Sequence, residues 1–211
     1  MSAVQGDIRP QASMWDYDGF VELAKLLKQS HSDVGQQEAA LQVLLYLTPK
    51  QIMWVFGALY RASPAQACEF FAWGSAIASA FLVGPSVVEQ GPVHLGAEEA
   101  RTDLYSTVKI RKCRFLTESG DCVGMCTNMC KIPAQRFFAE HVGVPVSMEP
   151  NFEDGSCKMV FGKTPPAAED DEALQEPCKK SNCSVYQDFV LTGKSGLCAP
   201  SGHHEVGTRA D

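Results

Sequence analysis

The sequence predicts an α+β protein in which a helical N-terminal half is followed by a small, mostly antiparallel sheet with a cysteine-rich metal-binding segment. The first half places apolar side chains at helical spacing, whereas the second half contains short segments in which polar and apolar side chains alternate. Seven of the nine cysteines lie between positions 113 and 183. We therefore divide the chain into a helical region at 1–103, a cysteine-rich domain at 104–183 and a flexible tail at 184–211.

Four helices are expected in the first half. The first is indicated by an amphipathic stripe at i, i+3, i+4 and i+7, formed by Phe20, Leu23, Ala24 and Leu27. A second helix is expected over about 36–47 and a third over about 51–61. The second should turn four apolar side chains inward: Leu41, Leu44, Leu45 and Tyr46. Ser63 followed by Pro64 has the pattern of an N-cap and a first helical residue, so a fourth helix should begin there.

The fourth helix contains an unusually long uncharged stretch. Residues 70–88 carry no charge over nineteen positions, which is close to the ~20 residues of a membrane span. Small and polar residues interrupt this stretch, and its strongly apolar part ends at Val83. We therefore predict that 70–83 is a helix buried in the core, with its small residues at a close helix contact. Contact with a membrane surface and a full membrane span are the alternatives.

The second half predicts strands separated by short connections. Polar and apolar alternation indicates strands over 104–115, 144–148 and 156–161, with a short helix over 135–142. Glu153 and Asp154 lie in an Asn-Phe-Glu-Asp-Gly stretch, where they fit turn residues better than an acid–base pair. The acidic residues at 169–172 indicate a solvated connector.

The charge of the chain excludes some partners. A net charge of −7 gives no sign of the clustered basic surface that nucleic-acid binding needs. Residues 1–13 lack the basic start and apolar run of a secretory signal peptide, and they lack the composition of a plastid transit peptide. We therefore expect either a chain without its transit peptide or a cytosolic protein. Without a secretory route, clustered thiols favour metal binding or redox chemistry over a disulfide framework.

The three cysteines spaced by four residues form the sharpest motif. Cys122, Cys126 and Cys130 would share one face of an uninterrupted helix, but the outer two would stand roughly 12 Å apart along its axis. Gly124 lies inside the motif and predicts a backbone turn that draws the thiols together. Cys157 is the expected fourth thiolate. Three other cysteines are in reserve for that position: Cys113, Cys178 and Cys183.

The spacing does not fix the occupant of this site. Three clustered thiolates and a fourth from elsewhere suit an iron–sulfur cluster, an iron ion or a structural zinc. The iron alternatives are favoured, and zinc, redox-sensing thiols and disulfides stay open. Nearby basic residues are expected to hold the thiols deprotonated: Lys109, Arg111, Lys112, Lys131 and Arg136.

Two segments resemble the plant β-carotene isomerase family of the strigolactone pathway. The first is CVGMCTNMCKIP at 122–133, preceded by CRFL at 113–116, and the second is MEPNFEDGSC at 148–157. Shorter matches follow at 161–162, 165–166 and 177–178. The strong resemblance covers roughly 105–180, and a looser one extends back to Phe20. The chain departs from the family in the spacing of Cys178 and Cys183, which is wider than expected.

The resemblance implies an iron-containing plastid protein that interconverts all-trans- and 9-cis-β-carotene. The implied cofactor is iron, as an ion or an iron–sulfur cluster, and the implied ligands are Cys122, Cys126, Cys130 and Cys157. The implied partners are a carotenoid substrate and, peripherally, plastid membranes. Because β-carotene has no ionisable or hydrogen-bonding group, the lack of a recognisable acid–base motif fits such a substrate. The alternative is a non-catalytic iron–sulfur or zinc protein with redox or interaction roles.

Overall fold

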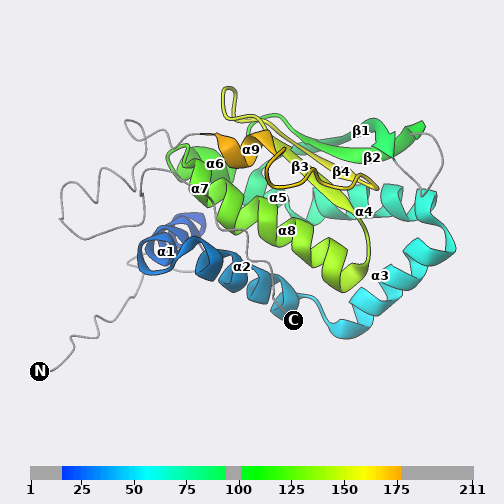
Figure 1. Ribbon diagram of the computed structural model, residues 1–211, viewed down its shortest axis with the longest axis horizontal. Coiled ribbons are helices and arrows are strands. Elements are labelled where there is room, and N and C mark those ends of the chain that lie inside the picture. The colour runs from blue at the N-terminus through cyan, green and yellow to red at the C-terminus, as the bar shows by residue number, and fades with distance from the viewer. Residues whose placement is uncertain (1–15, 94–100, 177–211) are drawn as a thin grey trace, which may run out of the picture.

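The structure is a computed structural model that describes residues 16–93 and 101–176. The predicted tail at 184–211 and two of the reserve cysteines, Cys178 and Cys183, lie outside these residues. Five helices form the first part of the chain (Figure 1): α1 Tyr17–Ser30, α2 Asp33–Leu47, α3 Lys50–Ala62, α4 Pro64–Ala78 and α5 Ala80–Val83. The α+β class predicted from the sequence is confirmed.

Four strands form one antiparallel sheet in the order β1-β2-β4-β3. The strands are β1 Ser86–Val93, β2 Arg101–Ile110, β3 Val146–Pro150 and β4 Cys157–Phe161. Strands near 144–148 and 156–161 are therefore confirmed, with shifts of one or two residues. The predicted strand at 104–115 is too long, because the chain turns after Ile110 into helix α6 Arg114–Glu118.

Strand β1 was not predicted. Its first residues continue the uncharged stretch that begins at residue 70, although Gly84 and Pro85 mark the end of the helix between them. The helical part of that stretch ends at Gly84, which has a φ of +85°. Positive φ suits glycine, so the turn into β1 falls at this residue. β1 pairs with β2 across residue 103, so the sheet draws on both sides of the proposed domain boundary.

A continuous helical run over 123–142, called here the central helix, lies between α2 and the sheet (Figure 1). It comprises α7 Val123–Cys126, the π-helical turn η1 Thr127–Lys131, α8 Ile132–Arg136 and a second π-helical turn, η2 Phe137–Val142. Wide turns of this kind are rare and occur often at functional sites. The helix predicted at 135–142 is thus the end of a much longer one.

The turn predicted at Gly124 is wrong, because Gly124 lies within α7. A Cβ at this position would lie 2.8 Å from Nζ of Lys28, whose buried side chain reaches over the start of the central helix. The glycine therefore fits a close approach between α1 and α7. The chain does not bend here to gather the thiols.

The core joins the first helices to the sheet through aromatic rings. Phe71 of α4 lies 6.4 Å from Phe138 of η2 and 6.1 Å from Phe161 of β4, measured between ring centroids. Phe138 and Phe161 meet edge to face at 5.2 Å. Such pairs contribute about 0.5–1.5 kcal/mol beyond the area they bury. This cluster fixes α4, the central helix and β4 in one packed unit.

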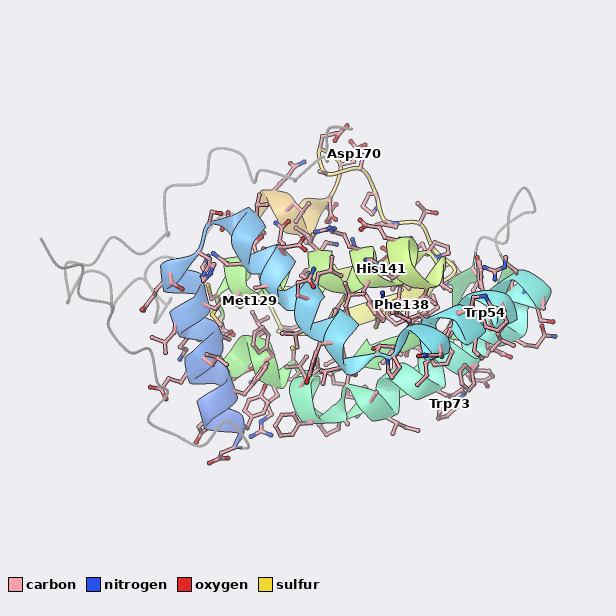
Figure 2. All side chains as sticks on the ribbon, turned by 90° about the horizontal axis from the view of Figure 1, so that it is seen from below. Trp54, Trp73, Met129, Phe138, His141 and Asp170 are labelled. Carbon is pink, nitrogen blue, oxygen red and sulfur yellow. The ribbon has the colours of Figure 1, made fainter. Side chains whose placement is uncertain are left out.

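The prediction that 70–83 is a buried helix is wrong for one of its faces. Ala67, Phe71 and Ala72 are buried, whereas Trp73 is 55% exposed and Ile77 is 77% exposed (Figure 2). A Cβ at Gly74 would meet no atom within 4 Å, so the expected close helix contact is absent at this residue. Among the described helices, none has the length and apolar character that crossing a membrane requires.

The inward faces of α1 and α2 also differ from the prediction. In α1 the buried side chains include Tyr17, Val21 and Ala24, whereas Leu23 is exposed. In α2, Leu41 is buried as expected, but Tyr46 is 90% exposed. The α2 helix begins earlier than predicted, because the Ser32 hydroxyl accepts a hydrogen bond from the Gly35 amide and caps the helix.

Candidate functional site

Four cysteine side chains line one small cavity between the central helix and the sheet. The cavity, called here the thiol cavity, is bordered by Cys113, Cys126, Cys130 and Cys157. Its volume of about 20 Å³ accommodates roughly one water-sized atom. Apart from Lys131 and Ser156, its remaining wall is apolar: Val83, Ile110, Phe115, Leu116, Met148 and Pro150.

Each thiol comes from a different element. Cys113 caps α6, and its amide donates a 2.8 Å hydrogen bond to the Gly155 carbonyl in the β3–β4 loop. Cys126 ends α7, and Cys130 lies in the π-helical turn η1. Cys157 begins β4, in register with Ile110 of β2. The convergence of the thiols therefore depends on tertiary packing, and no single helix or loop creates it.

A buried ion pair borders the thiol cavity. Lys131 Nζ lies 2.8 Å from Asp171 Oδ2 and also donates to the Met148 carbonyl. Both side chains are almost fully buried. Asp171 also accepts from the Ala173 amide, which caps helix α9 Glu172–Gln175. The pair therefore fixes the segment after the sheet against the central helix, next to the thiols.

Burial keeps the cavity thiols protonated. Burial raises the pKa of Cys130 to about 12, and it raises the pKa values of Cys113, Cys126 and Cys157 as well. Negative charge on neighbouring thiols raises the pKa of Cys126 further, and Lys131 only partly offsets this effect. The expectation that surrounding basic residues hold the thiols deprotonated is therefore wrong for the metal-free protein. One lysine borders the cavity, and desolvation outweighs it.

The donor set fits a thiolate-bound metal ion. Four cysteines around one cavity are the ligands that tetrahedral zinc or iron sites use. In the part of the chain that the structure describes, no three side chains of His, Cys, Asp or Glu stand close enough to hold an ion as they lie. Binding would therefore require the thiols to rotate inward and to lose their protons. The π-helical turn at Cys130 and the cap position of Cys113 are the places where the backbone leaves regular geometry.

Three of the four predicted ligands border the thiol cavity. Cys126, Cys130 and Cys157 line it together with Cys113, which was held in reserve. Cys122 is buried at the N-cap of α7 and is not part of the lining. The ligand set stays a prediction in two versions, which differ in whether Cys113 or Cys122 supplies the fourth thiolate. The six described cysteines form no disulfide with one another.

In the β3–β4 loop, the Asp154 carboxylate caps the turn as predicted, whereas Glu153 contributes its backbone amide. The Asn151 side chain accepts from the Glu153 amide, and the Asp154 side chain accepts from the Ser156 amide, each at 2.8 Å. Hydrogen bonds from Ser156 lower the pKa of Asp154, so this carboxylate is ionised at neutral pH. Neither acid lines the thiol cavity.

The fold and the site define an α+β protein that encloses four thiols beneath a helix with π-helical turns. Residues 81–170 match the family described as Beta-carotene isomerase D27-like, C-terminal. Over that segment the chain is similar to this family. No solved structure matches the chain.

Two curated relatives extend the match beyond the domain. Beta-carotene isomerase D27, chloroplastic, of Medicago truncatula is 42% identical over 164 residues, which are 78% of this chain and 62% of the relative. The Arabidopsis thaliana protein of the same name is 42% identical over 163 residues, 77% of this chain and 59% of the relative. The chain thus spans about three fifths of the length of these relatives.

The buried ion pair yields a stability prediction. Asp171→Asn keeps a side chain that can cap α9 but leaves the Lys131 charge without its counter-ion. We expect the free energy of unfolding in urea to fall by about 3–5 kcal/mol. Asp170→Asn, at the exposed neighbouring position (Figure 2), should change it by less than about 0.5 kcal/mol. Equal effects of the two substitutions would contradict a structural role for the pair.

The raised thiol pKa values predict how a metal binds. Because burial keeps the thiols protonated at neutral pH and ligands must be thiolates, each bound ion displaces protons, and affinity rises with pH. Cobalt(II) is a suitable probe, since its thiolate complexes absorb visible and near-ultraviolet light. Titration in weak buffer between pH 6 and pH 8.5 should show tightening with pH and release of about four protons per ion.

The same titration decides between the two ligand sets. Cys113→Ser should weaken cobalt binding and reduce proton release, whereas Cys122→Ser should leave both close to wild type. Circular dichroism of each variant controls for folding. The reverse pattern would place Cys122 in the site and leave Cys113 outside it.

Proposed function

We propose that the chain is an iron-dependent carotenoid cis–trans isomerase that interconverts all-trans- and 9-cis-β-carotene in the strigolactone pathway. One observation carries the proposal: every residue lining the thiol cavity lies within the matched segment 81–170. The two relatives are named for β-carotene isomerisation, and their names also give the chloroplast as their location. We propose the same compartment for this chain.

Iron would be held by Cys113, Cys126, Cys130 and Cys157. Soft thiolates favour iron and zinc over the hard cations that oxygen ligands bind. The cavity has room for a single ion, and a cluster would need its walls to move outward. When bound, thiolate-ligated iron supplies one-electron chemistry, and a brief one-electron change in a polyene lowers the barrier to rotation about its double bonds.

Residues around the cavity would exclude water from the reaction site. The apolar wall from Phe115, Leu116 and Met148 excludes water from the thiols. Lys131 adds one buried positive charge at the same wall, which favours thiolates once a metal has displaced their protons. A hydrocarbon substrate needs no hydrogen-bonding partner, and the wall offers few.

Apolar side chains line a candidate path for such a substrate from the protein surface to the thiol cavity. Val83 ends α5 and forms part of the cavity wall, while Phe81, two residues earlier, is exposed. Apolar side chains therefore continue from the surface of α4 and α5 to the edge of the thiol cavity. We propose that the polyene follows this path, and that contact with a plastid membrane delivers it.

A second candidate is a non-catalytic zinc or iron–sulfur protein. The observation that favours it is the enclosure of the cavity, because structural metal sites are closed whereas catalytic ones keep an open position. Metal analysis after anaerobic purification separates the two. Stoichiometric zinc without iron in a colourless protein would favour the structural role.

Activity and site are tested together with two substitutions. Anaerobically purified, iron-loaded protein should convert all-trans-β-carotene to the 9-cis isomer, or the reverse, without oxygen or a consumed cofactor. Cys126→Ser should reduce the rate to that of a protein-free control, because a hydroxyl is a poor ligand for thiophilic iron. Glu153→Gln should retain most of the activity, because Glu153 bonds in the turn through its backbone amide and does not line the thiol cavity. An active Cys126→Ser with an inactive Glu153→Gln would overturn the metal-centred mechanism and indicate acid–base chemistry.

A further inference from the structure

Helices α3, α4 and α5 expose a broad apolar surface that the fold leaves uncovered within the described residues. On α4 and α5 the exposed side chains follow one helical stripe, at Phe70, Trp73, Ile77 and Phe81. Trp54 and Val55 are exposed on the neighbouring helix α3, which packs against α4 through Phe56 and Phe70, with ring centroids 5.8 Å apart. We call this surface the α3–α4 face; both of its tryptophans are labelled in Figure 2. Large exposed apolar patches mark sites of contact with another phase or molecule.

The charge of this region is opposite to that of the chain. Residues 50–88 contain only three charged side chains, Lys50, Arg61 and Glu69, although the whole chain carries −7. Glu69 accepts a 3.0 Å hydrogen bond from the Tyr105 amide and is thereby held toward β2. The charged side chains of residues 50–88 therefore sum to +1 in a chain whose net charge is −7.

Both cations line the same pocket beside this face. A pocket of about 330 Å³ lies between α3 and the end of the central helix, and it is lined by Lys50, Arg61 and His141 together with Met53, Trp54, Gly57 and Val142. Among the residues that the structure describes, no acidic side chain forms an ion pair with Lys50 or Arg61. Trp54 belongs to both the pocket and the apolar face.

We infer that the α3–α4 face docks onto a membrane surface and that the Lys50–Arg61–His141 pocket binds the anionic headgroup of a lipid. Interfacial helices combine apolar side chains that enter the acyl region with cations that meet anionic headgroups, and tryptophan is enriched at this boundary. A pocket that shares Trp54 with the apolar face places a headgroup at the depth where the membrane begins. The charge complementarity favours an anionic membrane over a second copy of this acidic chain.

This inference deepens the proposed function by naming the surface through which a membrane-dissolved substrate would arrive. Its test needs no carotenoid and no iron, so the isomerase proposal and the docking proposal can fail separately. The complete 211-residue chain is mixed with vesicles of phosphatidylcholine, or of phosphatidylcholine with phosphatidylglycerol, and bound protein is measured by flotation. Wild type should bind the anionic vesicles more tightly than the neutral ones and should be partly released by salt.

Three variants locate the contact. Trp73→Glu combined with Ile77→Glu should abolish flotation with both vesicle types. Lys50→Gln combined with Arg61→Gln should weaken binding to anionic vesicles by roughly one order of magnitude and leave the weak binding to neutral vesicles unchanged. Val34→Glu is the matched control: Val34 is an exposed apolar residue at the start of α2, next to α1 and away from α3 (Figure 1). It should bind like wild type.

Two results would overturn the inference. Flotation that Val34→Glu weakens as much as the Trp73 and Ile77 pair would show non-specific adsorption. The second is a wild-type chain that binds neither vesicle type and sediments as a dimer, while the Trp73→Glu variant sediments as a monomer. That result would make the α3–α4 face an interface between two copies of the chain. Circular dichroism and thermal unfolding of every variant separate either result from misfolding.

Discussion

The packing of the central helix against the sheet is the constraint on which the rest of the structure depends. It brings Cys126 and Cys130, which are on the helix, to Cys157 at the start of β4. Polar and aromatic contacts hold this arrangement from both sides. Gln37 of α2 donates to Asn128 at 3.1 Å, Lys131 pairs with Asp171, and Phe138 meets Phe161. The thiol cavity is thus a product of the whole fold.

The electrostatics of the cavity follow from that packing. Four thiols enclosed by apolar side chains are neutral, since burial opposes their ionisation more strongly than one lysine favours it. A bound metal ion would reverse this balance, because its charge exceeds that of any nearby side chain. Under the proposed function, the cavity would exchange thiol protons for a cation. The buried ion pair beside it restrains the adjoining segment, and only its cationic member, Lys131, lines the wall.

Periodicity and spacing predicted much of this architecture but not its boundaries or its faces. The α+β class, the start of α4 at Pro64 and the two strands around the β3–β4 loop follow from local signals. Strand β1 was missed, because its first three residues continue the uncharged stretch of the preceding helix and only Gly84 and Pro85 separate the two. The exposure of Trp73 and Ile77 was also missed. Apolar composition alone cannot predict whether a neighbouring element covers a given side chain.

In the candidate site, too, local sequence patterns predicted some residues, and others depend on contacts between distant segments. Spacing predicted Cys122, Cys126 and Cys130 as ligands, with Cys157 as the fourth thiolate. The structure places the last three of these at the thiol cavity but not Cys122, and metal binding by them stays a prediction. Cys113 was only held in reserve, since its position depends on the Ile110–Cys157 register and on its hydrogen bond to Gly155. Both contacts join segments that are distant in sequence, so local sequence patterns do not predict them. At Gly124 a local signal was misinterpreted: the glycine was predicted to be a turn, but it lies in a helix and leaves room for the Lys28 side chain.

The central claim is that Cys113, Cys126, Cys130 and Cys157 surround one metal ion. X-ray absorption at the iron edge of anaerobically purified protein tests it most directly, because it counts and identifies the atoms bound to the metal. The account predicts four sulfur neighbours at about 2.3 Å, falling to three in Cys113→Ser and staying at four in Cys122→Ser. A first shell dominated by nitrogen or oxygen, or a sulfur lost in Cys122→Ser alone, would contradict it.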